Sequence, residues 1–203
     1  SFPAVERWLG NAIGDLPEYC IKGQAELAKK HSENTWKLLL ACSLFDRSAG
    51  VSRDMLGYVA DLSIADRDDG LSRLQHLCLI NRMSNDRFWV LPIVQRYSQA
   101  NYSSNGYGQF LTSRWLDCLS TYAQDKGIDL EWQFHLAAEF SIEYPNLLDA
   151  LRWARSKGNW DVTFKLAEGI WVYPHLIGLY NELDEILEAA EDAAKQLNDP
   201  IKN

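Results

Sequence analysis

The feature that most constrains the fold is a run of apolar residues between Trp36 and Phe45. Apart from Lys37 and Ser43, every residue in this run is apolar, so a helix built from it is apolar on nearly all sides. Ser32 stands before the run as a plausible N-cap. The run therefore predicts a core helix covered on most faces, and a chain of 203 residues with 47% hydrophobic residues is long enough to cover it.

Two further amphipathic segments follow the core helix. After a turn over residues 47–50, Ser52 is a second N-cap candidate, and apolar residues follow it at helical spacing up to Leu62. A third helix is expected over residues 67–79. Its expected inward residues are Leu71, Leu74, Leu77 and Cys78, and its expected outward residues are Arg73, Gln75 and His76.

A hairpin comes next. Residues 79–83 and 87–91 hold β-favouring side chains around the polar turn 84–86, and Trp89 is expected to pack between the hairpin and a helix. Pro92 suits the first position of a helix that continues to about Tyr102. Three helices, a hairpin wing and a closing helix predict a winged-helix domain over residues 32–105, preceded by a short helical N-terminal segment over residues 1–31.

The second half, residues 106–203, is expected to form an α-helical array after a turn-rich boundary at residues 101–108. Leu147, Leu151 and Ala154 recur as Leu183, Leu187 and Ala190 at an offset close to the ~34 residues of a tetratricopeptide (TPR) unit. A true repeat and an ordinary bundle both fit this pattern. The predicted helices cover residues 110–122, 131–144 (ending before Pro145), 147–158, 164–174 and 183–197.

Charge is distributed unevenly along the chain. Acidic and basic residues balance up to residue 105, so the whole net charge of −8 belongs to the second half. Such a chain is repelled by phosphate backbones, and Asp66, Asp68 and Asp69 open the helix that a winged helix would place in the major groove. The predicted wing offers Arg82 and Arg87 as phosphate contacts. Nucleic acid is therefore an unlikely partner on sequence grounds.

No motif for catalysis or metal binding is present. The chain has no phosphate-binding loop ending in Gly-Lys-Ser/Thr, and no signature supports a nucleophile, although a hydrolase on a helical scaffold stays a minor third hypothesis. The acidic groups near Asp66 and Asp184 suit a helix N-terminus and a solvated face. We expect no catalytic, cofactor or metal site. The widely spaced histidines and cysteines are interpreted as isolated histidines and reduced core thiols: His31, His76, His135, His175, Cys20, Cys42, Cys78 and Cys118.

Residues 38–97 resemble the winged-helix domain of STAND-class signalling NTPases, the NB-ARC or AP-ATPase family. The likeness lies in Leu39-Leu40-Ala41-Cys42-Ser43-Leu44-Phe45, in Leu71-Ser72-Arg73-Leu74 leading into Leu79-Ile80-Asn81-Arg82, and in Phe88-Trp89-Val90-Leu91-Pro92-Ile93-Val94-Gln95-Arg96-Tyr97. Residues 144–154 resemble the first helices of the TPR-like superhelix that follows in many members.

The resemblance implies a regulatory role without catalysis. It implies that ATP or ADP is bound by a nucleotide-binding domain that precedes the winged helix and that this chain lacks; the start at Ser1, without Met, also suggests a segment of a longer protein. Partners are then that domain or another protein, in the cytoplasm and not in a membrane. Leu91 stands where the family has a nucleotide-sensing His. Leu91 either occupies the nucleotide-sensing position or simply packs against the closing helix. The alternative is a winged-helix DNA-binding transcription regulator with an acidic effector or dimerisation domain.

Overall fold

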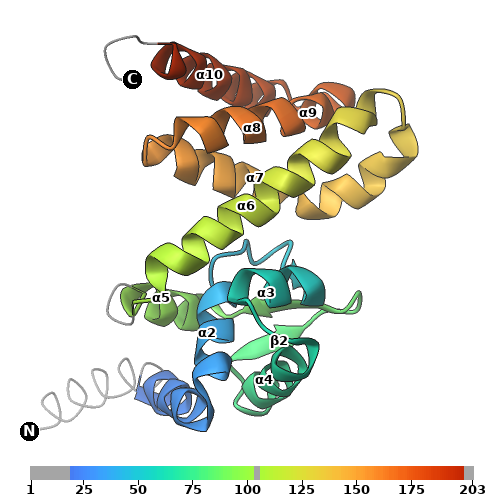
Figure 1. Ribbon diagram of the computed structural model, residues 1–203. Coiled ribbons are helices and arrows are strands. Elements are labelled where there is room, and N and C mark those ends of the chain that lie inside the picture. Colours follow the sequence, from blue (N-terminus) through green and yellow to red (C-terminus); the bar gives the residue numbers. More distant parts are fainter. Residues whose placement is uncertain (1–18, 103–105, 199–203) are drawn as a thin grey trace, which may run out of the picture. The chain divides into compact units, whose positions relative to one another are not determined.

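The computed structural model describes residues 19–102 and 106–198 (Figure 1), which are mainly helical with one small three-stranded antiparallel sheet. The chain divides into two compact units, Ser1–Thr112 and Ser113–Asn203. This division falls inside a long helix, shortly after the boundary at residues 105 and 106 that the sequence suggests. Of the expected N-terminal segment, residues 19–31 are helical and residues 1–18 lie outside the described part.

The first unit alternates helices with very short strands. Its elements, after the helical residues 19–31, are α2 (Glu33–Cys42), β1 (Val51–Ser52), α3 (Arg53–Ala60), α4 (Ile64–His76), β2 (Ile80–Arg82), β3 (Arg87–Val90) and α5 (Pro92–Ala100).

Helix α2 is the centre of the first unit, as its apolar run predicts. Leu38, Leu39 and Leu40 are all fully buried, although they point in three different directions around the helix. The helix contacts α3, α4, α5 and β3. The Ser32 hydroxyl caps its start by accepting from the Thr35 N–H at 3.0 Å, which confirms the predicted N-cap.

The predicted hairpin is confirmed, with slightly shorter strands. β2 pairs with β3 in the register Ile80 opposite Val90, and the turn is completed by Asp86 with a positive φ of 58°. The sheet has a third strand that the sequence analysis did not find. β1 pairs with the other edge of β3, with Val51 opposite Phe88, so the strand order is β1-β3-β2.

Helix α4 begins and ends three residues earlier than predicted. Its start is fixed by Ser63, whose hydroxyl accepts from the Asp66 N–H at 3.2 Å. Its end is fixed because Cys78 adopts a left-handed φ of 54°, which takes the chain out of the helix. The prediction that Cys78 faces inward is therefore wrong, since the residue is exposed.

The second unit is helical throughout its described residues. It contains most of α6 (Gly108–Gly127), the short 3-10 turns η2 (Ile128–Glu131) and η3 (Phe134–Leu136), α7 (Ala137–Ser156), α8 (Trp160–Ile170), α9 (Val172–Ile177) and α10 (Tyr180–Leu197).

Two prolines act differently from the predictions. Pro145 does not separate two helices but lies inside α7, because Phe140, Tyr144 and Leu147 continue one buried stripe across it. The burial of that stripe outweighs the ~3 kcal/mol that an interior proline costs. Pro174, in contrast, lies inside α9, and the predicted helix over 164–174 divides three residues earlier at Trp171. The division is there because a proline cannot donate to the carbonyl four residues earlier, which is that of Ile170.

The internal repeat, one of the two interpretations that the sequence allows, does not place equivalent residues in equivalent surroundings. Leu147, Leu151 and Ala154 are almost completely buried, whereas Leu187 is 49% exposed. The buried residues of α10 are Ile186, Ala189 and Ala193. The inward face of α10 is thus rotated from the face that Leu183, Leu187 and Ala190 form.

The four cysteines are free thiols, as predicted, but only Cys42 is a core residue. Cys20 and Cys78 are exposed and Cys118 is partly buried, so their assignment to the core is corrected. Burial raises the pKa of both Cys42 and Cys118 to about 12, which keeps these thiols protonated and unreactive at neutral pH.

Two glycines fix the second unit by letting α6 and α8 approach closely. A Cβ on Gly169 would lie 2.5 Å from the backbone carbonyl carbon of Ala123, and one on Gly127 would overlap the Gly169 carbonyl oxygen. Because these neighbours are backbone atoms, they cannot move aside as a flexible side chain could.

We therefore expect Gly169→Ala to lower the free energy of unfolding by about 1–3 kcal/mol, the usual effect of overpacking. Gly23→Ala is the matched control, because it lies in a helix and nothing is within 4 Å of its added Cβ. That variant should be neutral or slightly more stable. Urea unfolding followed by circular dichroism measures both, and a Gly169→Ala protein as stable as wild type would contradict the close contact.

Candidate functional site at the start of α4 and the hairpin

The start of α4 carries the acidic residues that the sequence analysis singled out. Asp66 lies in the first turn and accepts a hydrogen bond from the Ser63 hydroxyl at 2.7 Å, while its own N–H donates to that hydroxyl. The Ser63 hydroxyl therefore caps the first turn, and the Asp66 carboxylate holds that hydroxyl in place. The prediction that these carboxylates suit a helix N-terminus is confirmed for Asp66.

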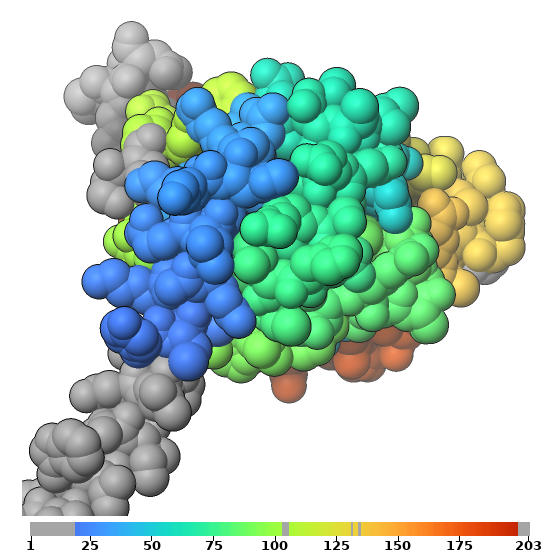
Figure 2. Space-filling model, turned by 90° about the horizontal axis from the view of Figure 1, so that it is seen from below, coloured from blue at the N-terminus to red at the C-terminus, as the bar shows by residue number. Residues whose placement is uncertain are grey.

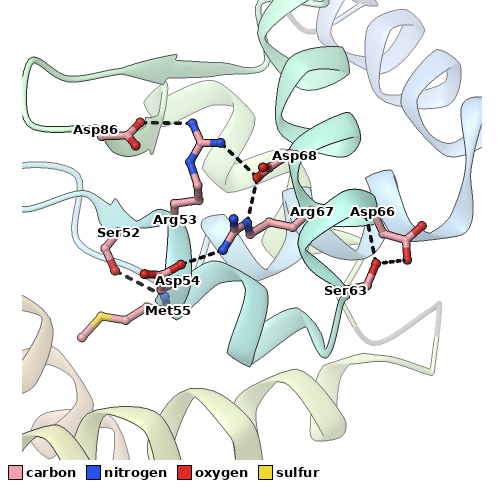
Figure 3. Close-up of polar contacts among 9 residues, drawn as sticks. All are labelled: Ser52, Arg53, Asp54, Met55, Ser63, Asp66, Arg67, Asp68 and Asp86. Atoms are coloured by element: carbon pink, nitrogen blue, oxygen red, sulfur yellow. Dashed lines mark hydrogen bonds and ion pairs between the residues drawn. The ribbon is translucent and has the colours of Figure 1, made fainter.

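Asp68 belongs to a chain of ion pairs that links α3 to α4 (Figure 3). Arg67 donates from Nε to Asp68 Oδ1 at 2.8 Å and from Nη1 to Asp54 Oδ1 at 2.7 Å. Arg53 donates from Nη1 to the same oxygen of Asp68 at 3.0 Å. Arg67 is buried along its length, with only 8% of its surface exposed.

The same chain of contacts reaches the hairpin. Arg53 Nη2 donates to Asp86 Oδ1 at 3.3 Å, and Arg82 Nε lies 2.8 Å from the same oxygen. Arg53 therefore connects the start of α4 with the β2–β3 turn. We call Arg53, Asp54, Arg67, Asp68 and Asp86 the arginine–aspartate network.

Arg87, one of the two expected phosphate contacts of the wing, points into the protein. It is 6% exposed, and its guanidinium donates to the carbonyl oxygens of Ala49 at 2.7 Å and Gly50 at 2.9 Å. Its role is to hold β3 against the turn that precedes β1. Arg82, the other expected contact, is exposed but paired with Asp86.

The network shifts the acidity of its members. The hydrogen bond from Arg67, followed by that from Arg53, lowers the pKa of Asp68 below its ordinary value. The hydrogen bond from Arg53 does the same for the pKa of Asp86. The pKa of each arginine is raised in return, for Arg53 first by Asp86 and for Arg67 first by Asp68. Arg53, Arg67, Asp68 and Asp86 are therefore charged at neutral pH.

Further along α4, polar side chains surround a shallow open depression. Ser72, Gln75 and His76 line it, and His76 Nδ1 lies 2.8 Å from the Ser72 carbonyl oxygen. The outward positions predicted for Gln75 and His76 are confirmed, whereas Arg73 is only partly exposed. Figure 2 shows α4 beside the helical residues 19–31, and His31 Nε2 lies 3.3 Å from Asp69 Oδ2 across this contact.

Leu91 lies at the surface. It follows the last residue of β3, serves as the N-cap of α5 and is 36% exposed. It makes no side-chain cap, and Pro92 follows as the first helical residue. Trp89, opposite Asn81 in the hairpin, is partly buried.

Sequence reasoning missed the two arginines that organise the network. Arg53 pairs with residues 15 and 33 positions away in the chain, so no local spacing announces these contacts. Within residues 19–102 and 106–198, no group of three or more His, Cys, Asp or Glu is placed to hold a metal ion, and no helix is long and apolar enough to cross a membrane.

In comparisons with known proteins, no family model, no curated protein and no solved structure matches this chain.

The network makes the stability of the first unit depend on pH in a defined direction. Because the pKa of Asp68 is lower in the folded than in the unfolded chain, its contribution is present above the unfolded value near 3.8 and is lost as the pH falls through the folded value. We expect the free energy of unfolding of the wild type to fall more steeply below pH ~5 than that of Asp68→Asn. Urea titrations at several pH values measure the two slopes, and equal slopes would show that the Asp68 carboxylate does not stabilise the fold.

Proposed function

We propose that this chain is a non-catalytic regulatory and protein-interaction segment of a STAND-type (NB-ARC) signal-transduction ATPase. On this proposal ATP or ADP is bound by a nucleotide-binding domain elsewhere in the protein, and the first unit is a winged helix that contacts that domain or another protein. The observation that carries the proposal is that the arginines around α4 and the hairpin form their hydrogen bonds and ion pairs within the first unit.

The order of elements in the first unit supports the winged-helix assignment. Helix α2 is followed by β1, α3, α4, the β2–β3 hairpin and α5, and β1 joins the hairpin through β3. In a DNA-binding protein of this type, α4 would be the helix placed in the major groove.

The charges around α4 favour a protein contact over a DNA contact. Arg53 and Arg67 are bound to aspartates, and Arg87 is bound to backbone carbonyls. A phosphate backbone approaching this side would meet the exposed carboxylates of Asp66 and Asp69. It could recruit these arginines only by breaking existing contacts, so the counterion-release contribution to DNA binding is small.

The second unit supports the TPR-like assignment through its arrangement of helices. Helix α8 packs against α7 on one side and α10 on the other, so successive helices form a stack (Figure 1). The stack is tied by Arg152, which donates to both carboxylate oxygens of Glu185 at 2.7 Å each. Helical stacks of this kind commonly serve as binding scaffolds.

A second candidate function is favoured by the outward side chains of α4. Gln75 and His76 are exposed on the helix that a winged-helix transcription regulator would use for base contacts. This alternative keeps the acidic second unit as an effector or dimerisation domain.

Binding to duplex DNA separates the two candidates. We expect no mobility shift of a 30-base-pair duplex at ~0.15 M salt with protein up to about 10 µM, because specific complexes at this salt form well below that concentration. A shift that weakens with salt and is lost in a Gln75→Ala/His76→Ala double variant would favour the transcription regulator instead.

Exchange of Leu91 tests the regulatory role in the protein that contains the nucleotide-binding domain. Because Leu91 is at the surface, Leu91→His should leave the melting temperature unchanged. If this position faces bound nucleotide, the imidazole adds a hydrogen bond and slows release of a fluorescent ADP about two- to tenfold. Leu91→Ala is the control, since it removes the side chain without adding a donor. Unchanged ADP release from a stable Leu91→His protein would contradict the proposed geometry.

A further inference from the structure

Helix α10 carries two apolar stripes, and only the first is fully buried among the described residues of the second unit. The first stripe contains Ile186, Ala189 and Ala193, which are buried and lie on the helix that packs against α8. The second stripe contains Tyr180, Leu183, Leu187, Ala190 and Ala194, and we call it the open seam. Tyr180 is 65% exposed and Leu187 is 49% exposed, while the other three are partly exposed.

The spacing of the open seam is that of a helix-to-helix contact. Its residues follow one another at alternating intervals of three and four, which is the heptad pattern of a seam into which one further helix packs. Over Tyr180 to Ala194 the seam is ~21 Å long at ~1.5 Å per residue. Ala190 and Ala194 have short side chains, so the backbone of an approaching helix can come close at that end.

The residues that flank a heptad seam determine which helix it accepts. On the inner side of the open seam the flanking positions are Ile186 and Ala193, which are already buried. On the outer side they are Asp184 and Glu191, which are both exposed. Glu191 pairs with Lys195 one turn later, so Asp184 contributes more to the negative charge of the outer flank.

The arginines of the neighbouring helix α7 bind other acids of α10. Arg152 of α7 binds Glu185, and Arg155 of α7 binds Asp192 through Nε at 3.0 Å. Both of these acids lie on the side of α10 away from the open seam. The outer flank therefore keeps a negative charge that a basic side chain on a docking helix would match.

We propose that the open seam of α10 is the docking face for a basic amphipathic helix of a partner protein. The partner helix has apolar residues at three-and-four spacing and Lys or Arg on the flank that faces Asp184 and Glu191. A second copy of this chain fits less well, because antiparallel pairing of two open seams brings these acids against each other. The proposal goes beyond the proposed function and does not depend on any nucleotide-binding domain.

A designed peptide tests the proposal directly on the 203-residue chain. The probe is a fluorescein-labelled three-heptad helix with Leu at both seam positions, Lys at both flanking positions and Ala or Gln elsewhere. The control peptide has Glu in place of each Lys. Fluorescence anisotropy should show saturable binding of the Lys peptide, and at least about tenfold weaker binding of the Glu peptide at low salt.

Variants of the protein locate the binding site. Leu187→Gln should weaken the Lys peptide about fivefold or more, because it puts a polar side chain where the peptide would cover the exposed half of a leucine. Asp184→Lys should weaken it about threefold, with the difference vanishing in high salt. Asp125→Lys on α6 changes the net charge equally at an exposed site outside α10 and should have no effect on binding.

Circular dichroism and melting temperature verify that each variant is folded, and Tyr180→Ser is the second seam variant if Leu187→Gln is unstable. Three results would overturn the proposal. The Lys peptide fails to bind at 100 µM, the seam variants bind it as wild type does, or the wild type is a dimer that Leu187→Gln converts to a monomer. The last result would assign the open seam to a second copy. None of these results bears on ADP release in the Leu91→His experiment.

Discussion

The first unit depends on the burial of α2 on nearly all its sides. A helix whose successive leucines all need cover cannot lie at the surface, so α3, α4, α5 and β3 are arranged around it. Polar contacts then fix this arrangement at its edges. Gln95 of α5 donates to the Ser43 carbonyl oxygen after α2 at 3.2 Å, and Arg87 of β3 donates to the turn at residues 49–50. The outer side of α4, the hairpin turn and the start of α5 remain exposed around this core.

The use of arginine is common to both units. In the first unit, Arg53 and Arg67 hold α3, α4 and the hairpin together, and in the second, Arg152 and Arg155 hold α7 to α10. Individual exposed ion pairs contribute little, but chains that share a carboxylate restrict several elements at once. Because arginines are committed to these internal contacts, the surplus of acidic residues in the second half remains directed to solvent. This distribution of charge is the reason why we propose basic partners in preference to phosphate.

The sequence predicts the helices and strands better than it predicts which of them pack against one another. The buried run of α2, the Ser32 cap, the hairpin and the Pro92 start all follow from local rules and agree with the structure. Strand β1 is only two residues long, so no alternation could reveal it. The continuation of α7 through Pro145 depends on the burial of residues far away in the chain. The candidate site was predictable only in its acidic half, since the arginines that neutralise Asp68 and Asp86 are selected by the tertiary fold.

The contrast between α7 and α10 shows why an apolar pattern does not by itself establish burial. Leu151 and Leu187 occupy matching places in the two patterns, yet Leu151 is 1% exposed and Leu187 is 49% exposed. Helix propensity and periodicity are the same for both, so the difference arises only from which helices lie beside them. Covering the remaining surface of Leu187 would contribute on the order of 1 kcal/mol, roughly half the value of a fully buried leucine. The exposed surface of Tyr180 adds to this gain, while the partly exposed Leu183, Ala190 and Ala194 add less. The entropy cost of association therefore makes a neighbour depend on matching charge as well as apolar contact.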